Sequence, residues 1–243
     1  MRINIILKGN GPINLPLSYN QTIQGFLYKN LSDPYLRDFI HNKGFNKEKR
    51  IFKFFSFSRL EGNFKINNNK KRIIFTDKVT LKVTSMFPPF IENLANTLIK
   101  EDNLTLGTNI VKAKEVFLEK PSIEENMKIK TLSPIVIYST LSNENKKFTH
   151  YYSPQEKQFA TMIKENLIRK ASIFNSKSKN MDFEIKTISY NKNPNIIRYK
   201  NFIIKGWMGT FELKGDIELI KIAYNYGLGS KNSQGFGMIE KIS

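Results

Sequence analysis

The chain has 243 residues, enough for one large domain or for two domains of about 120 residues each. It has no cysteine, which excludes disulfide bonds, thiolate zinc sites and a cysteine nucleophile, and its two histidines make an all-histidine metal site nearly impossible. Lysine and arginine total 39 against 21 acidic residues, a formal net charge of +18, so we expect a polyanionic partner, most simply nucleic acid.

An anionic membrane surface is the rival partner for so basic a chain, and the sequence disfavours it. No segment is apolar enough to span a bilayer, and the basic residues are dispersed instead of gathered on one amphipathic helix. The residues from Met1 to Lys8 become polar too soon for a signal peptide. We therefore expect a cytoplasmic protein without membrane contact, with a generally lysine-rich composition as the alternative explanation of the charge.

The first elements in chain order are a strand and two helices. Alternating residues over 2–8 predict a strand, and apolar residues at helical spacing predict a helix over 20–31. Asp33 and Pro34 are typical of a helix start, and Gly44 of a helix end, so they bracket a short second helix. The remaining elements predicted before residue 120 are strands at 51–58, 72–76, 79–84 and 104–118 and a helix that begins at Pro88.

Polar and acidic residues at 121–126 predict a linker, after which the pattern repeats. The elements predicted after it are a strand at 128–140, a helix at 154–171, strands at 182–190 and 197–212, a helix at 216–226 and a strand at 236–242. Each half is therefore roughly β-α-β-β-α-β. The predicted fold is α+β, with two tandem ferredoxin-like (RRM-like) domains at residues 1–120 and 126–243, a scaffold that many RNA-binding proteins use.

The most distinctive segment is glycine-rich and runs from Gly227 to Gly237, Gly-Leu-Gly-Ser-Lys-Asn-Ser-Gln-Gly-Phe-Gly. Such a loop can expose backbone N–H groups and let them approach a phosphodiester. It is not a dinucleotide fingerprint, because Asn232 stands where the third glycine is needed and a helix precedes the loop. The alternative, a glycine-capped helix followed by a flexible turn, explains Gly227 and leaves the other glycines unexplained.

The segment from Tyr226 to Met238 resembles the C-terminal signature of the sixth Cas family, the CRISPR-associated RNA endonucleases of the RAMP superfamily. Looser similarity covers the whole chain, including Ile23 to Tyr28, Lys53 to Ser58 and Leu132 to Ile135. The resemblance implies two ferredoxin-like domains, no metal or other cofactor, and cleavage of CRISPR repeat RNA (pre-crRNA). Its products would be a 5′-hydroxyl and a 2′,3′-cyclic phosphate, formed by attack of the RNA's own 2′-hydroxyl.

The resemblance assigns catalysis to His41, with Tyr28 and Lys53 as assisting residues. Histidine can give or take a proton near neutral pH, a lysine suits the charge of a phosphorane, and a tyrosine can donate a hydrogen bond. For each of them a structural or merely solvated role is the alternative. Lys47, Lys49 and Arg50 are alternatives to Lys53, and His150 matches no catalytic position and is predicted to be structural or RNA-contacting.

The glycine-rich segment is predicted to bind the RNA backbone. Its predicted RNA-binding residues are Gly227, Gly229, Ser230, Lys231, Asn232, Ser233, Gly235 and Gly237. Phe236 between its glycines is better explained as a core anchor than as a stacking platform. Further candidates for phosphate contacts are Lys177, Lys179, Lys192, Arg198 and Lys200.

The expected partner is CRISPR repeat RNA, with a multisubunit CRISPR interference complex as a second expected partner. The sequence leaves open whether the protein is a monomer or a homodimer. Two other functions also stay open at this point. One is a repeat-RNA-binding subunit that does not cut, and the other is an unrelated tandem RNA-binding protein.

Overall fold

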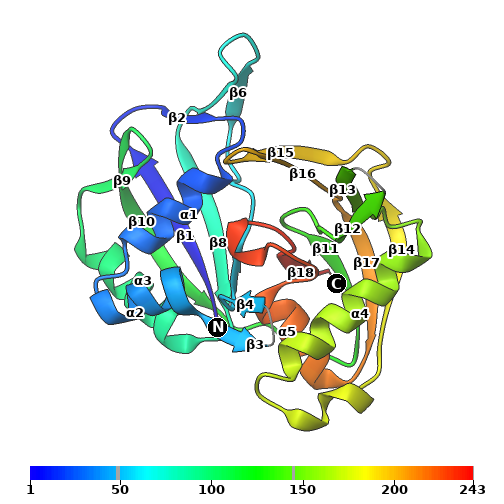
Figure 1. The fold of residues 1–243 in the computed structure, drawn as a ribbon. Helices are drawn as coiled ribbons and strands as arrows, with labels where there is room; N and C mark the ends of the chain where they lie inside the picture. Colours follow the sequence, from blue (N-terminus) through cyan, green and yellow to red (C-terminus); the bar gives the residue numbers. More distant parts are fainter. Residues whose placement is uncertain (48–49, 144–145, 243) are drawn as a thin grey trace.

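A computed structural model describes residues 1–47, 50–143 and 146–242. The chain forms two antiparallel sheets with helices packed on them, and its last segment lies between the two (Figure 1). The first sheet has the order β5-β8-β1-β10-β9. Its strands are β1 (Arg2–Gly9), β5 (Phe55–Phe57), β8 (Lys78–Ser85), β9 (Leu104–Leu106) and β10 (Asn109–Glu119). The second sheet has the order β14-β17-β11-β18. Its strands are β11 (Asn126–Thr131), β14 (Phe183–Tyr190), β17 (Gly209–Gly215) and β18 (Ile239–Lys241).

The helices follow the predicted positions. They are α1 (Asn20–Lys29), α2 (Pro34–Asp38), α3 (Pro88–Lys100), α4 (Lys157–Ala171) and α5 (Ile217–Tyr226), with a π-helical turn η1 (Phe39–Lys43) and 3₁₀ turns η2 (Ser176–Asn180) and η3 (Asn232–Gln234). The elements β1-α1-β5-β8-α3-β10 and β11-α4-β14-β17-α5-β18 both run β-α-β-β-α-β. In both sheets the third strand of that unit pairs with the first, and the fourth strand pairs with the first on its other side. The predicted α+β fold is confirmed.

Smaller hairpins and sheets surround this framework. They are β2 (Ile13–Pro16), β7 (Arg72–Phe75) and β6 (Phe64–Asn67) in one sheet, and the pairs β3 (Phe45–Lys47) with β4 (Arg50–Phe52), β12 (Tyr138–Asn143) with β13 (Lys146–Tyr151), and β15 (Asn195–Tyr199) with β16 (Phe202–Gly206). The hairpin β15–β16 reaches toward the first half of the chain (Figure 1). There the Arg198 backbone N–H donates to the Ser18 hydroxyl, 3.1 Å away.

The prediction of one strand over 51–58 is wrong, because the chain turns at Phe54. Phe54 has φ 53° and is fully buried. Its carbonyl oxygen accepts from the Ser85 hydroxyl at 2.7 Å, which fixes the turn. Phe55 and Phe57 belong to the core of the first sheet, whereas Phe52 and Phe54 belong to the core of the second. The aromatic side chains of this one segment are therefore divided between two hydrophobic cores. Period-two spacing in the sequence does not distinguish the two cores.

Three other predicted strands are also divided. The predicted strand 104–118 is the hairpin of β9 and β10, which turns at Gly107 with φ 62°. The predicted strand 128–140 stops at Thr131, since Leu132 and Ser133 both donate their N–H to the Met238 carbonyl and leave the sheet. The predicted strand 197–212 is part of β15, all of β16 and part of β17, with a turn at Lys200 where φ is 52°.

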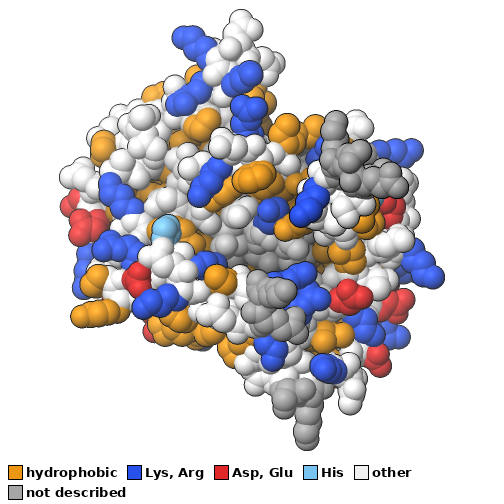
Figure 2. All heavy atoms as spheres, viewed as in Figure 1, with side chains coloured by type: hydrophobic (Ala, Val, Ile, Leu, Met, Phe, Trp, Pro, Cys, Tyr) orange, Lys and Arg blue, Asp and Glu red, His pale blue; other side chains and the backbone are white. Residues whose placement is uncertain are grey.

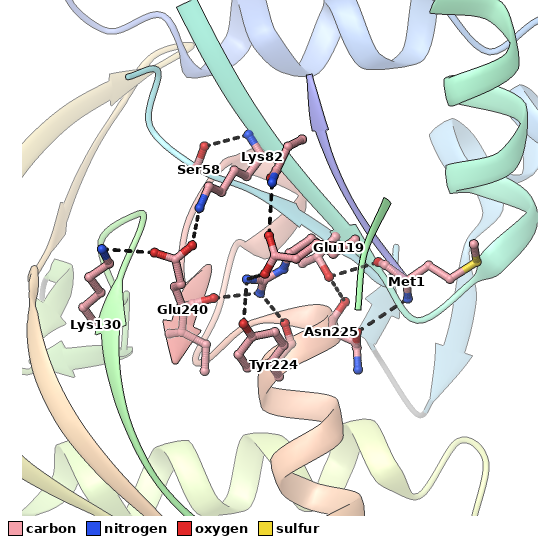
Figure 3. Close-up of polar contacts among 12 residues, drawn as sticks. Met1, Ser58, Lys82, Glu119, Lys130, Tyr224, Asn225 and Glu240 are labelled. Carbon is pink, nitrogen blue, oxygen red and sulfur yellow. Dashed lines mark hydrogen bonds and ion pairs between the residues drawn. The ribbon is translucent and has the colours of Figure 1, made fainter. Parts of the chain in front are cut away.

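A buried arginine joins the two halves of the chain. Arg2 in β1 is fully buried and donates to the backbone carbonyls of Tyr224, at 3.1 Å, and Ile239, at 2.7 Å. Lys82 of β8 pairs with Glu240 of β18 in the same network (Figure 3). Phe52 and Phe54 also belong to the second core. The boundary at residues 120 and 126 therefore stays a prediction, because the halves share packing and polar contacts.

Candidate active site

A cavity of about 440 Å³ lies between the two halves and is lined by all three predicted catalytic residues, among others. His41, Tyr28 and Lys53 line it from the first half, and Tyr199, Lys200 and Lys231 line it from the second. Lysine and arginine side chains gather around the depression between the halves (Figure 2). We call this space the His41 cavity. It brings together residues as far apart in sequence as Tyr28 and Lys231.

His41 lies on the π-helical turn η1, which continues directly from α2. The Asp33 side chain accepts from the Tyr35 and Leu36 N–H groups and starts α2, as predicted, and Gly44 ends η1 with φ 66°. The His41 ring is exposed, and its Nδ1 lies 2.7 Å from Asn42 Oδ1. This local sequence therefore places an imidazole at a helix end facing the cavity.

Tyr28 packs directly against the His41 ring. Their ring centroids are 4.8 Å apart with the planes at 85°, an edge-to-face contact. Tyr28 makes a second edge-to-face contact with Phe55, with ring centroids 5.7 Å apart. Burial raises the pKa of the Tyr28 hydroxyl well above its usual value. The hydroxyl therefore stays protonated at neutral pH and can act as a hydrogen-bond donor.

Lys53 lies between β4 and β5, and its Nζ donates to the His41 carbonyl oxygen at 2.8 Å. Burial lowers the pKa of Lys53. Among the alternatives, Lys47 donates instead to the Ser172 carbonyl at 3.4 Å, and Arg50 lines a different cavity. Lys49 lies outside the described residues. Lys53 is thus the basic residue of this segment that contacts His41.

The glycine-rich segment, residues 227–238, is called the tail loop below, and it packs against α1. Asn20 Nδ2 donates to the carbonyls of Gln234, at 2.7 Å, and Gly235, at 3.1 Å. Gln24 Nε2 donates to the Ser233 carbonyl at 2.7 Å. These bonds hold the end of the second half on the helix that carries Tyr28, so the tail loop forms one wall of the His41 cavity.

The expectation that the tail loop exposes its backbone N–H groups is wrong at several positions. Gly227, Gly235 and Gly237 donate theirs inside the protein, to the carbonyls of Ala223, Asn232 and Pro134, each at 2.9 Å. These glycines are buried and serve the packing of the loop. At Gly237, where φ is 74°, an added Cβ would overlap the Leu228 carbonyl oxygen.

A buried lysine holds the tail loop in place through hydrogen bonds. Lys170 of α4 is 1% exposed, and its Nζ donates to the carbonyls of Gly227, at 2.7 Å, and Gly229, at 3.0 Å. It also donates to Asn232 Oδ1 at 3.0 Å and lies 4.3 Å from the centre of the Tyr226 ring. Burial lowers the pKa of Lys170, while the three oxygens and the ring favour its charged form.

The predicted RNA-binding residues of the tail loop therefore separate into two groups. Asn232 is buried, and its Nδ2 donates to the Leu228 and Phe236 carbonyls, at 3.0 and 3.1 Å, so it holds the loop together like Gly227, Gly235 and Gly237. Gly229, Ser230, Lys231 and Ser233 line cavities. Phe236 is fully buried, as predicted for a core anchor.

A second, larger cavity of about 700 Å³ adjoins the first and shares Lys53, Lys231, Ser233 and Gln234 with it. Its basic lining includes Arg50 and Arg169. We call it the basic cavity. Of the other predicted phosphate contacts, Lys200 lines the His41 cavity, Lys179, Lys192 and Arg198 are exposed, and the side chain of Lys177 lies outside the described residues.

Sequence reasoning missed Gln24, Tyr199 and Phe202, which also line the His41 cavity. The Tyr199 hydroxyl donates to Gln24 Oε1 and ties the hairpin β15–β16 to α1. The turn of this hairpin is Lys200-Asn201, without glycine or proline, so the sequence carried only the weak turn signal of one asparagine. His150 bonds Glu156 at 2.8 Å, which fits the structural role predicted for it.

Two further features concern metal binding and membrane insertion in the described residues. In residues 1–47, 50–143 and 146–242, no group of three or more histidine, aspartate and glutamate side chains is placed to hold a metal ion. Within the same ranges, none of the helices has the length and apolar character needed to cross a membrane.

Comparison with known proteins gives a consistent result. Residues 118–241 match the family model described as CRISPR associated protein Cas6, C-terminal. The chain is 28% identical to the CRISPR-associated endoribonuclease Cas6 1 of Methanocaldococcus jannaschii, across 100% of this chain and 93% of that protein. It is 26% identical to the CRISPR-associated endoribonuclease Cas6 of Pyrococcus furiosus, across 93% and 83%. A solved structure described as CRISPR associated protein Cas6 superposes with a TM-score of 0.82 at 26% identity, covering 100% of this chain and 99% of that one.

Proposed function

Because the chain belongs to the CRISPR-associated Cas6 family, we propose that it is an endoribonuclease that cleaves CRISPR repeat RNA without a metal ion. The observation that carries the proposal is the meeting of His41, Tyr28 and Lys53 on one cavity, next to a loop that bears Lys231. Family membership removes the unrelated tandem RNA-binding protein from the alternatives. A repeat-RNA-binding subunit that does not cut remains as the competing function.

The chemistry needs no metal ion because RNA carries its own nucleophile. The 2′-hydroxyl must lie in line with the scissile phosphorus, lose its proton and attack, while the 5′-oxygen leaves and gains a proton. In our proposal His41 is the general acid or base, and the Lys53 ammonium stabilises the charge on the phosphorane. The protonated Tyr28 hydroxyl donates a hydrogen bond to a phosphate or leaving oxygen.

The tail loop would hold the RNA next to these residues. We propose phosphate contacts from Gly229, Ser230, Lys231 and Ser233, which line the two adjoining cavities. The buried Gly227, Asn232, Gly235 and Gly237 would shape the loop without touching RNA. This narrows the RNA-binding set that the sequence predicts to four members. Asn232 also lines the basic cavity, but its side chain is already hydrogen-bonded inside the loop and to Lys170.

The test is a cleavage assay with RNA of the repeat from the same genome. His41→Ala should lower the rate by at least about 100-fold, the lower end of what general acid–base catalysis typically contributes, and leave RNA affinity within about threefold. His150→Ala is the matched control, because His150 bonds Glu156 outside the His41 cavity, and it should cleave normally. EDTA should have no effect, and a 2′-deoxy nucleotide at the cleaved position should block the reaction.

Each other outcome contradicts a particular part of the proposal. Full activity of His41→Ala would remove that residue from catalysis, and cleavage of the deoxy RNA would exclude attack by the 2′-hydroxyl. Loss of activity in EDTA would show a metal requirement. Tight and specific RNA binding by the wild-type protein without any cyclic-phosphate product would favour the non-catalytic subunit.

A further inference from the structure

His41 is the first member of a short chain of side-chain contacts. Its Nδ1 lies 2.7 Å from Asn42 Oδ1, and Asn42 Nδ2 donates to Asp38 Oδ1, also at 2.7 Å. The other Asp38 oxygen, Oδ2, pairs with Lys43 Nζ at 3.3 Å. Asp38 and Asn42 are four residues apart on the continuous turns of α2 and η1, which puts their side chains on one face.

The hydrogen bonds in this series of side-chain contacts can run in only one direction. The hydrogen bonds from Asn42 and Lys43 lower the pKa of Asp38, so its carboxylate is ionised and can only accept. Asn42 must therefore turn its amide nitrogen to Asp38 and its carbonyl oxygen to His41. A carbonyl oxygen also only accepts, so Nδ1 of His41 carries the hydrogen. In a neutral imidazole the second nitrogen, Nε2, is then a bare acceptor.

Two other contacts restrain His41 from different sides. Tyr28 packs edge-to-face on the ring at 4.8 Å, and Lys53 Nζ holds the His41 carbonyl oxygen at 2.8 Å. The Gly44 N–H closes the π turn on the Phe39 carbonyl at 2.6 Å. The ring, its Nδ1 and its backbone are thus each contacted by a different residue, and Nε2 is the ring nitrogen left to meet a substrate.

We propose that Asp38 and Asn42 are positioning residues that hold neutral His41 as the Nδ1–H tautomer, which makes Nε2 the general base. This rests on the proposed function, and it gives Nε2 of the neutral ring the base role in the attack step. The 2′-hydroxyl proton passes to Nε2, the bond from the 2′-oxygen to phosphorus forms, the bond to the 5′-oxygen breaks, and the 5′-oxygen takes a proton from solvent. Asn42 Oδ1 accepts from Nδ1 before and after the transfer, so the ring need not rotate.

The tautomer can be measured without any RNA. In long-range proton–nitrogen NMR spectra at mildly alkaline pH, where an unperturbed histidine is neutral, the protonated and bare ring nitrogens of the protein's two histidines are distinguishable. A His150→Ala variant assigns the remaining signals to His41. We expect a protonated Nδ1 and a bare Nε2 in the wild-type protein. In Asn42→Ala the two tautomers should mix.

The kinetic consequence separates positioning from structure. Asn42→Ala should lower kcat by about tenfold with little change in KM, because RNA still binds while the base is misoriented. Asn42→Asp alone keeps an acceptor for Nδ1 but loses the donor to Asp38 and puts two carboxylates together, so it should recover less of kcat than a double variant that also carries Asp38→Asn. The double variant Asp38→Asn with Asn42→Asp exchanges donor and acceptor, since an amide at position 38 can donate to a carboxylate at position 42. It should recover the tautomer and much of kcat, whereas Asn68→Ala, in the distant turn between β6 and β7, should change nothing.

The two proposals fail in different ways. A protonated Nε2 in wild-type His41, or an unchanged tautomer and kcat in Asn42→Ala, would overturn the positioning role even if the protein cleaves RNA. An Nδ1–H tautomer that depends on Asn42, in a protein that binds repeat RNA without cutting it, would keep the positioning role and overturn the proposed function. The side chains of Asp38 and Asn42 are exposed, so thermal unfolding of the variants should match the wild type.

Discussion

At the scale of single residues, the positive charge of the chain has two different uses. Most of the 39 basic residues belong to the surface, and these set the attraction to a polyanion. Lys170 and Arg2 are buried, and each binds several carbonyl oxygens instead. Net charge therefore overstates the charge available to a ligand, and a buried basic side chain in this protein binds backbone carbonyls instead.

Replacing Lys170 tests this role. Lys170→Met keeps the length of the side chain but leaves the carbonyls of Gly227 and Gly229 without their donor. We expect a loss of about 3 kcal/mol in the free energy of unfolding, or a melting temperature lower by about 10 °C. Thermal unfolding measures it, with Lys164→Met of the same helix as control. Lys164 pairs with Asp182 at the surface, at 3.2 Å, and its loss should cost under about 1 kcal/mol. Equal stability of the two variants would contradict the fastening role.

The candidate site was only partly predictable residue by residue. Family resemblance indicated His41, Tyr28 and Lys53, and all three line one cavity. It could not indicate Asn42, because a surface asparagine beside a histidine has no distinctive spacing until the direction of its hydrogen bonds is known. Tyr199 was equally hidden, since its contact with Gln24 joins residues that are remote in sequence.

At the scale of elements, the tail loop is held by its own hydrogen bonds and by α1. Asn232 bonds across it, and Asn20 and Gln24 bond it to the first half. Gly227 and Gly237 are needed because the loop crosses itself closely there, whereas Gly229 and Gly235 approach Val136 and Phe57 outside the loop. The sequence predicted that this loop needs its glycines, and the structure agrees. The prediction explained that need by contacts with the ligand, whereas in the structure it comes mainly from the packing of the loop.

A pair of glycine substitutions tests that attribution. Gly237→Ala should destabilise the protein by about 3 kcal/mol, because the new Cβ meets the Leu228 carbonyl and φ is positive. Gly25→Ala in α1 is the control, since a Cβ there meets nothing within 4 Å. Alanine favours a helix over glycine, so this variant should gain about 0.5–1 kcal/mol. Urea unfolding distinguishes the two signs, and a neutral Gly237→Ala would show that the loop can relax.

Element prediction succeeded best for the helices. Helices α1 and α3 keep their apolar stripes on the first core and were found near their observed positions. The run 51–58 failed because its aromatic residues divide between two cores, and that division depends on tertiary contacts. Local periodicity shows that a residue is buried without showing against what.

At the scale of the whole molecule, the two halves of the chain pack together and share polar contacts. The fold class followed from patterns within each half, whereas the interface between them depends on contacts such as that of Arg2 with Ile239. No spacing pattern in the sequence predicts such a contact. The His41 cavity is a property of this interface, because its walls come from both halves.

Removing the buried arginine tests the interface. Arg2→Met leaves the carbonyls of Tyr224 and Ile239 without their donor and should lower the free energy of unfolding by about 3–5 kcal/mol. Lys8→Met in the same strand is the control, because Lys8 meets Asp77 only at an exposed pair, 3.9 Å apart, and should change stability by less than about 1 kcal/mol. Calorimetry should show the larger loss for Arg2→Met. Similar melting curves for both variants would exclude Arg2 as a determinant of the interface.

The hydrogen bonds from α1 to the tail loop also bear on how the protein is made. Synthesis releases Tyr28, His41 and Lys53 from the ribosome nearly two hundred residues before Lys231, Ser233 and Gln234. Until those last residues emerge, Asn20 and Gln24 have no tail loop to bind, and Arg2 has no Ile239 carbonyl to meet. The wall that completes the His41 cavity is thus translated long after the residues it faces, so a nascent chain carries His41 in an unfinished pocket until the tail loop and Ile239 have emerged.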